Sequence, residues 1–133
     1  MKQMNVEAVV QNIDPVTEFI GKELKAHGCS DRALLQIAVA VDEVFGNIAH
    51  YAYAGEKGGV NVRVDVKDGF AEIIFTDEGV PFNPLKSEEP DVSLSAEDRD
   101  IGGLGIFLVK KTMDNLEYQH KDGRNILKLT KRI

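Results

Sequence analysis

The sequence predicts an α+β domain that is built as a two-layer α/β sandwich, with its helices on one face of the sheet. Two patterns favour this class. Apolar and polar residues alternate over 60–75, as in strands with one buried face, whereas apolar residues recur at helical spacing over 31–53. A sheet with a single apolar face needs helices on that face only, which distinguishes this fold from a doubly wound one.

The composition excludes several classes of protein. A chain of 133 residues fits a single domain, predicted here to span 1–133, and its net charge of -6 argues against a nucleic-acid-binding surface over the whole domain. Cys29 is the only cysteine, so no internal disulfide forms. No signal-peptide core and no run of 18 apolar residues occur. We therefore expect a cytoplasmic protein without a membrane span or a direct nucleic-acid partner.

The first two elements are read from alternation and from helix-end signals. Residues 5–13 alternate weakly and predict a strand. Asp14 and Pro15 then suit the N-cap and the first position of a helix, and Gly28 suits its end.

The stretch 31–53 predicts a long helix that begins after a capping Ser30 and ends at the glycines of 55–59. It carries a thin polar stripe that includes Glu43 and Asn47, with apolar residues opposite. Such a stripe either faces a cavity or is the solvated edge of an amphipathic helix. Gly46 lies in the middle of this helix, and close helix packing is favoured over ligand contact as its reason.

The remaining elements are two hairpins and one more helix. Residues 60–75 predict a hairpin with its turn at 67–69, and 116–131 predict a second with its turn at 122–123. Between them, the polar stretch 85–100 is either a functional lid or a disordered segment. Helical spacing returns after the glycine-rich stretch 102–105.

Three groups of residues suggest chemistry. Gly102, Gly103 and Gly105 lie where a loop becomes a helix, a place that can bind phosphate or simply form a turn. Asp77 ends a strand two residues before Gly79, so it can accept a hydrogen bond from a ligand amine or belong to a hairpin-end turn.

Glu43 and Asn47 lie one helical turn apart and suit two different roles. An amide oxygen such as that of Asn47 can ligate Mg²⁺, which usually keeps waters and phosphate oxygens as its other ligands. A carboxylate such as Glu43 can orient or deprotonate a hydroxyl that attacks a phosphate.

The joint occurrence of these features, in this order, resembles the N, G1 and G2 boxes of the GHKL ATPase superfamily. The stretches DEVFGNIAHYAY, DEGVPFNP and GGLGIFLVKKTMD carry the resemblance, together with the closing GRNILKLTKR. Within the superfamily the chain is most similar to the anti-sigma factor serine/threonine kinases of the RsbW and SpoIIAB type. The resemblance implies the Bergerat ATP-binding fold, with a mixed, mostly antiparallel sheet, and an ATP lid at 82–102.

The resemblance also implies a role for each matching residue. Glu43 would be the general base, Asn47 would hold Mg²⁺ against ATP, and Asp77 would receive the adenine amino group, with Gly79 close to the ring. The positions that would wrap the phosphates or complete the nucleotide site are Gly103, Leu104, Gly105 and, through a water, Thr130 on the last strand. Many members carry an arginine beside the second glycine box; the nearest here is Arg99, three residues before Gly102.

The function that the resemblance implies is an ATP- and Mg²⁺-dependent serine kinase and anti-sigma factor. Its substrate would be a STAS-type anti-anti-sigma protein, its other partner a sigma factor, and its form a homodimer. Two alternatives remain open. The displaced Arg99 favours the first, a nucleotide-gated binding switch that transfers no phosphate. The second is a stand-alone histidine-kinase-like ATPase domain.

Overall fold

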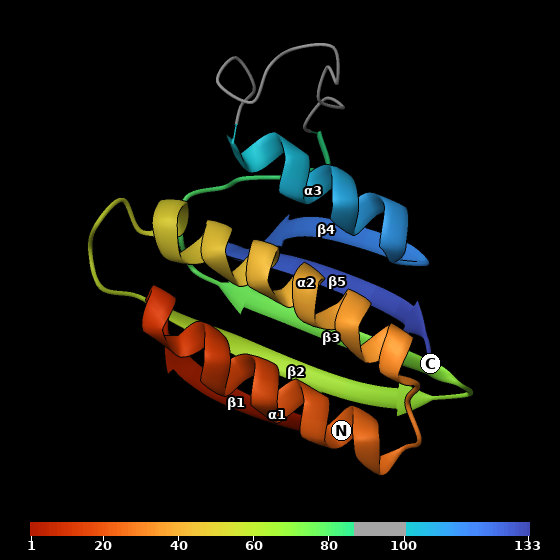
Figure 1. Ribbon diagram of the computed structural model, residues 1–133. Helices are drawn as coiled ribbons and strands as arrows, with labels where there is room; N and C mark the ends of the chain where they lie inside the picture. Colours follow the sequence, from red (N-terminus) through yellow and green to blue (C-terminus); the bar gives the residue numbers. More distant parts are fainter. Residues whose placement is uncertain (87–100) are drawn as a thin grey trace.

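The computed structural model describes residues 1–86 and 101–133, which form a five-stranded sheet with three α-helices on one of its faces (Figure 1). The expected lid at 82–102 therefore lies mostly outside the described residues, as does Arg99. In chain order the main elements are β1 (Lys2–Glu7), α1 (Ile13–Ala26), α2 (Asp31–Asn47), β2 (Gly59–Lys67), β3 (Phe70–Asp77), α3 (Ile101–Thr112), β4 (Asn115–Lys121) and β5 (Arg124–Arg132).

The strand order is β1-β2-β3-β5-β4, and all four described pairings are antiparallel. The two-layer α+β sandwich is confirmed, but the expected mixed sheet is wrong. Two helices, not one, separate β1 from β2, so the chain returns antiparallel to β1. β3 and β4 run parallel to each other, but they are not neighbours: β5 lies between them and pairs antiparallel with both.

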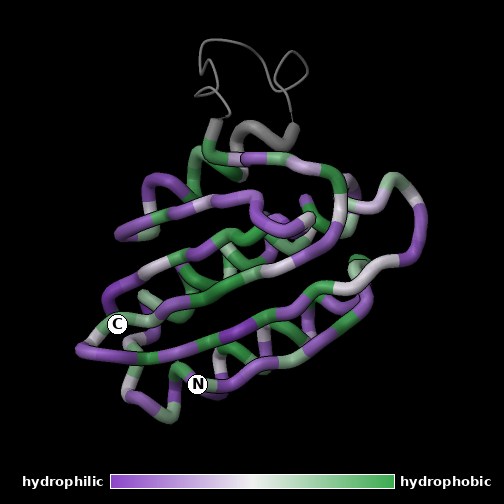
Figure 2. The backbone as a smooth tube through the Cα atoms, turned by 180° about the vertical axis from the view of Figure 1, so that it is seen from behind, coloured by the Kyte–Doolittle hydropathy of each residue, from purple (hydrophilic) through white to green (hydrophobic). Residues whose placement is uncertain are grey.

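The uncovered face of the sheet is turned toward the viewer in Figure 2, where hydrophilic and hydrophobic residues alternate along the strands. The same alternation appears in burial: inward residues of β2 and β3 such as Val62, Val64 and Ile73 are fully buried, while their neighbours are partly exposed. The alternation of apolar and polar residues that predicted the hairpin therefore matches the alternation of buried and partly exposed residues in β2 and β3.

The first strand is shorter than predicted, and it begins earlier. β1 ends at Glu7 rather than continuing to residue 13, because the chain turns there: the Val9 N–H donates to the Glu7 carbonyl. The Asn12 side chain donates to the same carbonyl, and residues 10–12 form a 3-10 turn. Local side-chain to backbone bonds of this kind compete successfully with strand pairing.

Helix α1 begins at Ile13, with Asp14 in its first turn, and ends where Gly28 was expected to stop it. Gly28 has φ of +77°, its N–H donates to Lys25, and the next N–H, that of Cys29, donates to Leu24. This 6→1 and 5→2 pair is a Schellman motif, which needs a left-handed residue and so favours glycine.

Helix α2 lies between α1 and α3 and continues into a π-helical turn, η2 (Ile48–Ala52) (Figure 1). By length and composition alone, Asp31–Ala52 could also cross a membrane. Its apolar face is instead packed on the sheet. The core that it forms with the strands includes Ile37, Val41, Val44, Phe45, Val62, Ile73, Phe75, Leu127 and Leu129. Packing therefore accounts for the inward part of the apolar pattern, whereas Leu35 and Val39 of the same helix are exposed.

The start of α2 gives a direct test of the capping interpretation. Ser30 has an extended backbone, and its Oγ accepts a hydrogen bond of 3.2 Å from the Ala33 N–H. We expect Ser30→Ala to lower the free energy of unfolding by about 1 kcal/mol, because one N–H at the helix end loses its acceptor. Ser30→Asp, which keeps an acceptor oxygen, should retain most of the native stability. Urea denaturation followed by circular dichroism measures both; equal stability of Ser30→Ala and the native chain would contradict the cap.

Candidate functional site

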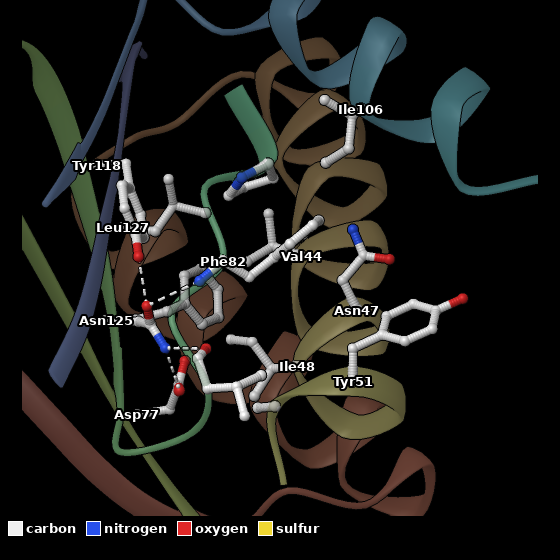
Figure 3. A pocket seen from close by; sticks show the side chains of 14 residues that line it. Val44, Asn47, Ile48, Tyr51, Asp77, Phe82, Ile106, Tyr118, Asn125 and Leu127 are labelled. Carbon is white, nitrogen blue, oxygen red and sulfur yellow. Dashed lines mark hydrogen bonds between the residues drawn. The ribbon is translucent and has the colours of Figure 1, made fainter. Parts of the chain in front are cut away.

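A cavity lies between the C-terminal part of α2 with η2, the end of β3 and the start of β5 (Figure 3). Its wall is mostly apolar, with a few polar side chains that point inward. The lining includes Val44, Asn47, Ile48, Phe75, Asp77, Phe82, Ile106, Tyr118, Asn125 and Leu127. The cavity volume is about 40 Å³, enough for a few water molecules. A purine would have to widen it by displacing side chains such as Phe82, which is 48% exposed.

Asp77, at the end of β3, is one of two buried polar side chains in the described part of the chain. Its Oδ1 accepts hydrogen bonds from the Gly79 N–H (2.9 Å) and from Nδ2 of Asn125 (3.0 Å). A buried carboxylate needs such partners, because its desolvation is otherwise costly. The structure thus brings Asp77 and Asn47, two residues predicted for the site, to the walls of one cavity.

Asn125 is the second buried polar side chain, and sequence reasoning missed it. It sits opposite Asp77 in the β3–β5 pairing, and it also bonds Tyr118 on β4 and the backbone of residues 79–82. One signal was available: Asn125 shares the inward period of two with Leu127 and Leu129, so a polar residue interrupts an otherwise apolar face.

The prediction that Thr130 assists the adenine site is wrong, because the register of the β3–β5 pairing places this residue elsewhere. It pairs with Glu72 near the other end of β3, and it therefore lies on the opposite face of the sheet from Asp77. Because side chains alternate along β5, only Asn125 and every second residue after it face the helices. Asn125 occupies the place beside Asp77 that the prediction gave to Thr130.

Gly79 is placed by contact with the long helix. A Cβ at this position would lie 2.2 Å from the carbonyl oxygen of Ala52, and the next N–H, that of Val80, donates to the same oxygen. The Tyr53 hydroxyl adds a second link, because it accepts from the Glu78 N–H and donates to the Gly59 carbonyl. Burial raises the pKa of this hydroxyl. The loop after β3 is therefore fixed to the end of η2.

Asn47 lines the cavity, whereas Glu43 lies one turn earlier on α2 and is half-buried. Burial raises the pKa of the Glu43 carboxyl above its usual 4.5; the hydrogen bond from Asn47 opposes this shift, and the negative charge of Asp42 adds to it. Since the Asn47 amide nitrogen donates to the Glu43 carboxyl, the Asn47 amide oxygen is left to accept a hydrogen bond or to ligate a cation.

Helix α3 meets α2 at Glu43. A Cβ on Gly105 would lie 2.0 Å from the Glu43 carboxyl carbon, so a larger residue here would force the Glu43 carboxyl to move from its observed position. The helix begins at Ile101, and Gly103 and Leu104 belong to its first turn rather than to a preceding loop. The Gly103 N–H is among the first N–H groups of the helix, which lack intrahelical acceptors and can face an anion.

Within residues 1–86 and 101–133, no group of three or more acidic, histidine or cysteine side chains is arranged to hold a metal ion. A magnesium ion at a phosphate site usually takes one or two protein oxygens and fills its shell with waters and phosphates. The Asn47 amide oxygen is a ligand of the required kind.

The comparisons with known protein sequences agree with one another. The model of the family described as histidine kinase-like ATPase domain matches residues 6–131. The serine-protein kinases RsbW of Bacillus mycoides (strain KBAB4) and of Bacillus cereus (strain B4264) are each 31% identical over 99 residues. Each match covers 71% of this chain and 61% of the relative, so the chain spans less than two thirds of the relatives' length.

Solved structures support the fold. A crystal structure of RsbU and RsbW domains from Mycobacterium tuberculosis aligns with 99% of this chain and 32% of that chain, with a TM-score of 0.65 and 15% sequence identity. At this identity the likeness concerns the arrangement of helices and strands alone.

Two glycines of the site should respond in opposite ways to an added methyl group. Gly79→Ala should lower the free energy of unfolding by about 1–3 kcal/mol, because the Cβ meets the Ala52 backbone, which cannot move aside cheaply. Gly46→Ala is the matched control. Among the residues that the structure describes, its Cβ would meet nothing within 4 Å, and alanine favours a helix by up to about 1 kcal/mol.

Thermal and urea denaturation of the two variants give the comparison. Native-like stability of Gly79→Ala would contradict the close approach. Because no described residue lies close to Gly46, the predicted close helix packing at this position is wrong. A Gly46→Ala variant that is less stable than the native chain would contradict these open surroundings.

The shifted pKa of Glu43 can be measured directly by ¹³C NMR titration of its carboxyl carbon. We expect a midpoint above 4.5, and a still higher one in Asn47→Ala, where the opposing hydrogen bond is gone. Because the folded pKa exceeds the usual value, the contribution of this group to stability declines as pH rises from 4.5 through the folded pKa. A midpoint at or below 4.5 would contradict the burial of Glu43.

Proposed function

Because the chain belongs to the histidine kinase-like ATPase domain family, we propose that it binds ATP and transfers the γ-phosphate to a serine of a protein partner. One observation carries this proposal: Asp77 and Asn47 line one cavity, and a half-buried carboxyl with a raised pKa, that of Glu43, lies one turn from Asn47. The likeness to RsbW serine-protein kinases supports the choice of serine as acceptor.

Each residue of the site has a separate task in this proposal. Asp77 accepts a hydrogen bond from the adenine amino group, and the fixed loop at Gly79 forms the floor beside it. The Asn47 amide oxygen ligates Mg²⁺, which when bound neutralises charge on the phosphates. The N-terminal turn of α3, with Gly103, Leu104 and Gly105, faces the phosphates through its free N–H groups.

Glu43 acts as the general base. It takes the proton from the acceptor serine as the serine Oγ forms its bond to the γ-phosphorus, and the bond to the leaving ADP oxygen breaks. A raised pKa makes a carboxylate a better proton acceptor near neutral pH. In the described conformation Gly105 covers this carboxylate, so the first turn of α3 has to shift before a serine can reach it.

The partner in this proposal is a small STAS-type anti-anti-sigma protein, and the alternative partner is a sigma factor. The chain carries a net charge of -6, and phosphorylation adds roughly two negative charges to the partner's interface, which favours release. The resemblance to the RsbW type supports these partners, a homodimeric form and action in the cytoplasm.

A nucleotide-gated switch without phosphotransfer is the second candidate. The specific observation in its favour is that Glu43 is hydrogen-bonded to Asn47 and covered by Gly105. If α3 never moves away, the chain can bind ATP and a partner without deprotonating a serine.

The decisive experiment incubates γ-³²P-labelled ATP with the chain and its cognate STAS protein. We expect phosphoserine on the partner, and a loss of transfer of about 100-fold or more in Glu43→Gln, because the amide cannot accept the proton. ATP affinity should stay close to native, since Glu43 lies outside the cavity wall. Glu18→Gln, on the exposed face of α1, is the matched control and should transfer as the native chain does.

Two outcomes would change the proposal. Tight ATP binding by the native chain without phosphoserine would replace the kinase by the switch. Native transfer by Glu43→Gln would remove Glu43 from the role of general base.

A further inference from the structure

We propose that Asn125 makes the cavity selective for adenine, because it fixes Asp77 as a hydrogen-bond acceptor and keeps neither of its own amide hydrogens for a 6-oxo purine. This inference rests on the proposed binding of ATP and adds a positioning residue to it. The observations that carry it are the hydrogen bonds around the Asn125 amide, which is 7% exposed. In Figure 3 this amide lies between Asp77 and Tyr118.

The oxygen end of the amide is fixed by donors. The Phe82 N–H lies 3.3 Å from Asn125 Oδ1, and the Tyr118 hydroxyl donates to the same oxygen. A backbone N–H can only donate, so the atom that faces Phe82 has to be the oxygen. These two donors therefore determine which end of the Asn125 amide is the oxygen.

The nitrogen end is fixed by acceptors. Asn125 Nδ2 lies 2.9 Å from the Val80 carbonyl, 3.3 Å from the Gly79 carbonyl and 3.0 Å from Asp77 Oδ1. Carbonyl oxygens can only accept, so a turned amide would place its oxygen against two others. Turning it would leave several buried groups unpaired, which disfavours the turned amide.

Two consequences follow for a ligand. First, the amide nitrogen has two hydrogens and three acceptors around it, so no hydrogen remains for a ligand carbonyl. Second, both donors to Asp77, the Gly79 N–H and Asn125 Nδ2, bind Oδ1. The hydrogen bonds described for Asp77 thus leave Oδ2 to accept from the ligand.

Such a site recognises an exocyclic amine. Adenine carries an amine at C6, whereas hypoxanthine and guanine carry a carbonyl there, which would face the Asp77 carboxylate without a hydrogen between them. Sites that hydrogen-bond a ligand N–H reject analogues that lack it, because buried polar groups are then left unpaired.

The test compares dissociation constants of ATP and inosine triphosphate, which has a carbonyl in place of the 6-amine, by isothermal titration calorimetry with Mg²⁺. The native chain should bind ATP at least about tenfold more tightly. In Asn125→Asp two carboxyl groups adjoin and share a proton, which can be donated to a 6-oxo group, so the preference for ATP should fall by about fivefold or more. Tyr118→Phe removes one donor to the amide oxygen and should reduce the preference less.

Asn5→Asp is the matched control, because Asn5 Oδ1 accepts from Asn61 on the far side of the sheet and an aspartate can do the same. It should keep the native preference. If Asn125→Asp does not fold, as judged by circular dichroism, Tyr118→Phe decides. An unchanged preference in the folded variants, or an equal loss of affinity for both nucleotides, overturns the selectivity role alone. A native chain that binds neither nucleotide overturns the proposed function as well.

Discussion

The hydrogen bond between Asp77 and Asn125 is the interaction on which the site depends. It joins the end of β3 to the start of β5 in a place where both side chains are buried. Burial obliges each to find partners, and the partners come from β4 and from the loop after β3. Since networks of this kind strengthen when complete and are costly when partly satisfied, one buried pair fixes three strands and a loop together.

The long helix α2 contacts the same loop from the other side of the cavity. Its end, η2, holds the loop through the Ala52 carbonyl and the Tyr53 hydroxyl, so the loop is fixed at both the helix and the sheet. Gly79 has to be a glycine at this junction because two backbones meet. The helix therefore serves as core on one face and as a wall of the cavity on another, which explains why its polar stripe is thin.

Much of the fold could be predicted because its signals are local. The cap at Ser30, the stop at Gly28 and the two hairpins depend on neighbours in sequence, and all are observed. Alternation with Leu127 and Leu129 places Asn125 on the inward face, but its role could not be found locally, since its partner Asp77 lies 48 positions away and meets it only after β3 and β5 pair. The error over Thr130 has a related origin: which residue of the last strand lies beside Asp77 is decided by the register of that pairing.

The two ends of the site differ in how far they are formed, and this difference bears on function. At Asp77 the two hydrogen bonds that orient the carboxylate form without a ligand, so the end proposed for adenine is pre-organised and costs little to order on binding. At Glu43 the carboxyl is covered by Gly105 and held by Asn47. A carboxyl covered in this way has a raised pKa, which suits a base, yet it has to be uncovered before it can act. In the proposed mechanism, binding of a nucleotide and transfer of its phosphate are therefore separable steps, and a shift of the first turn of α3 away from Glu43 would connect them.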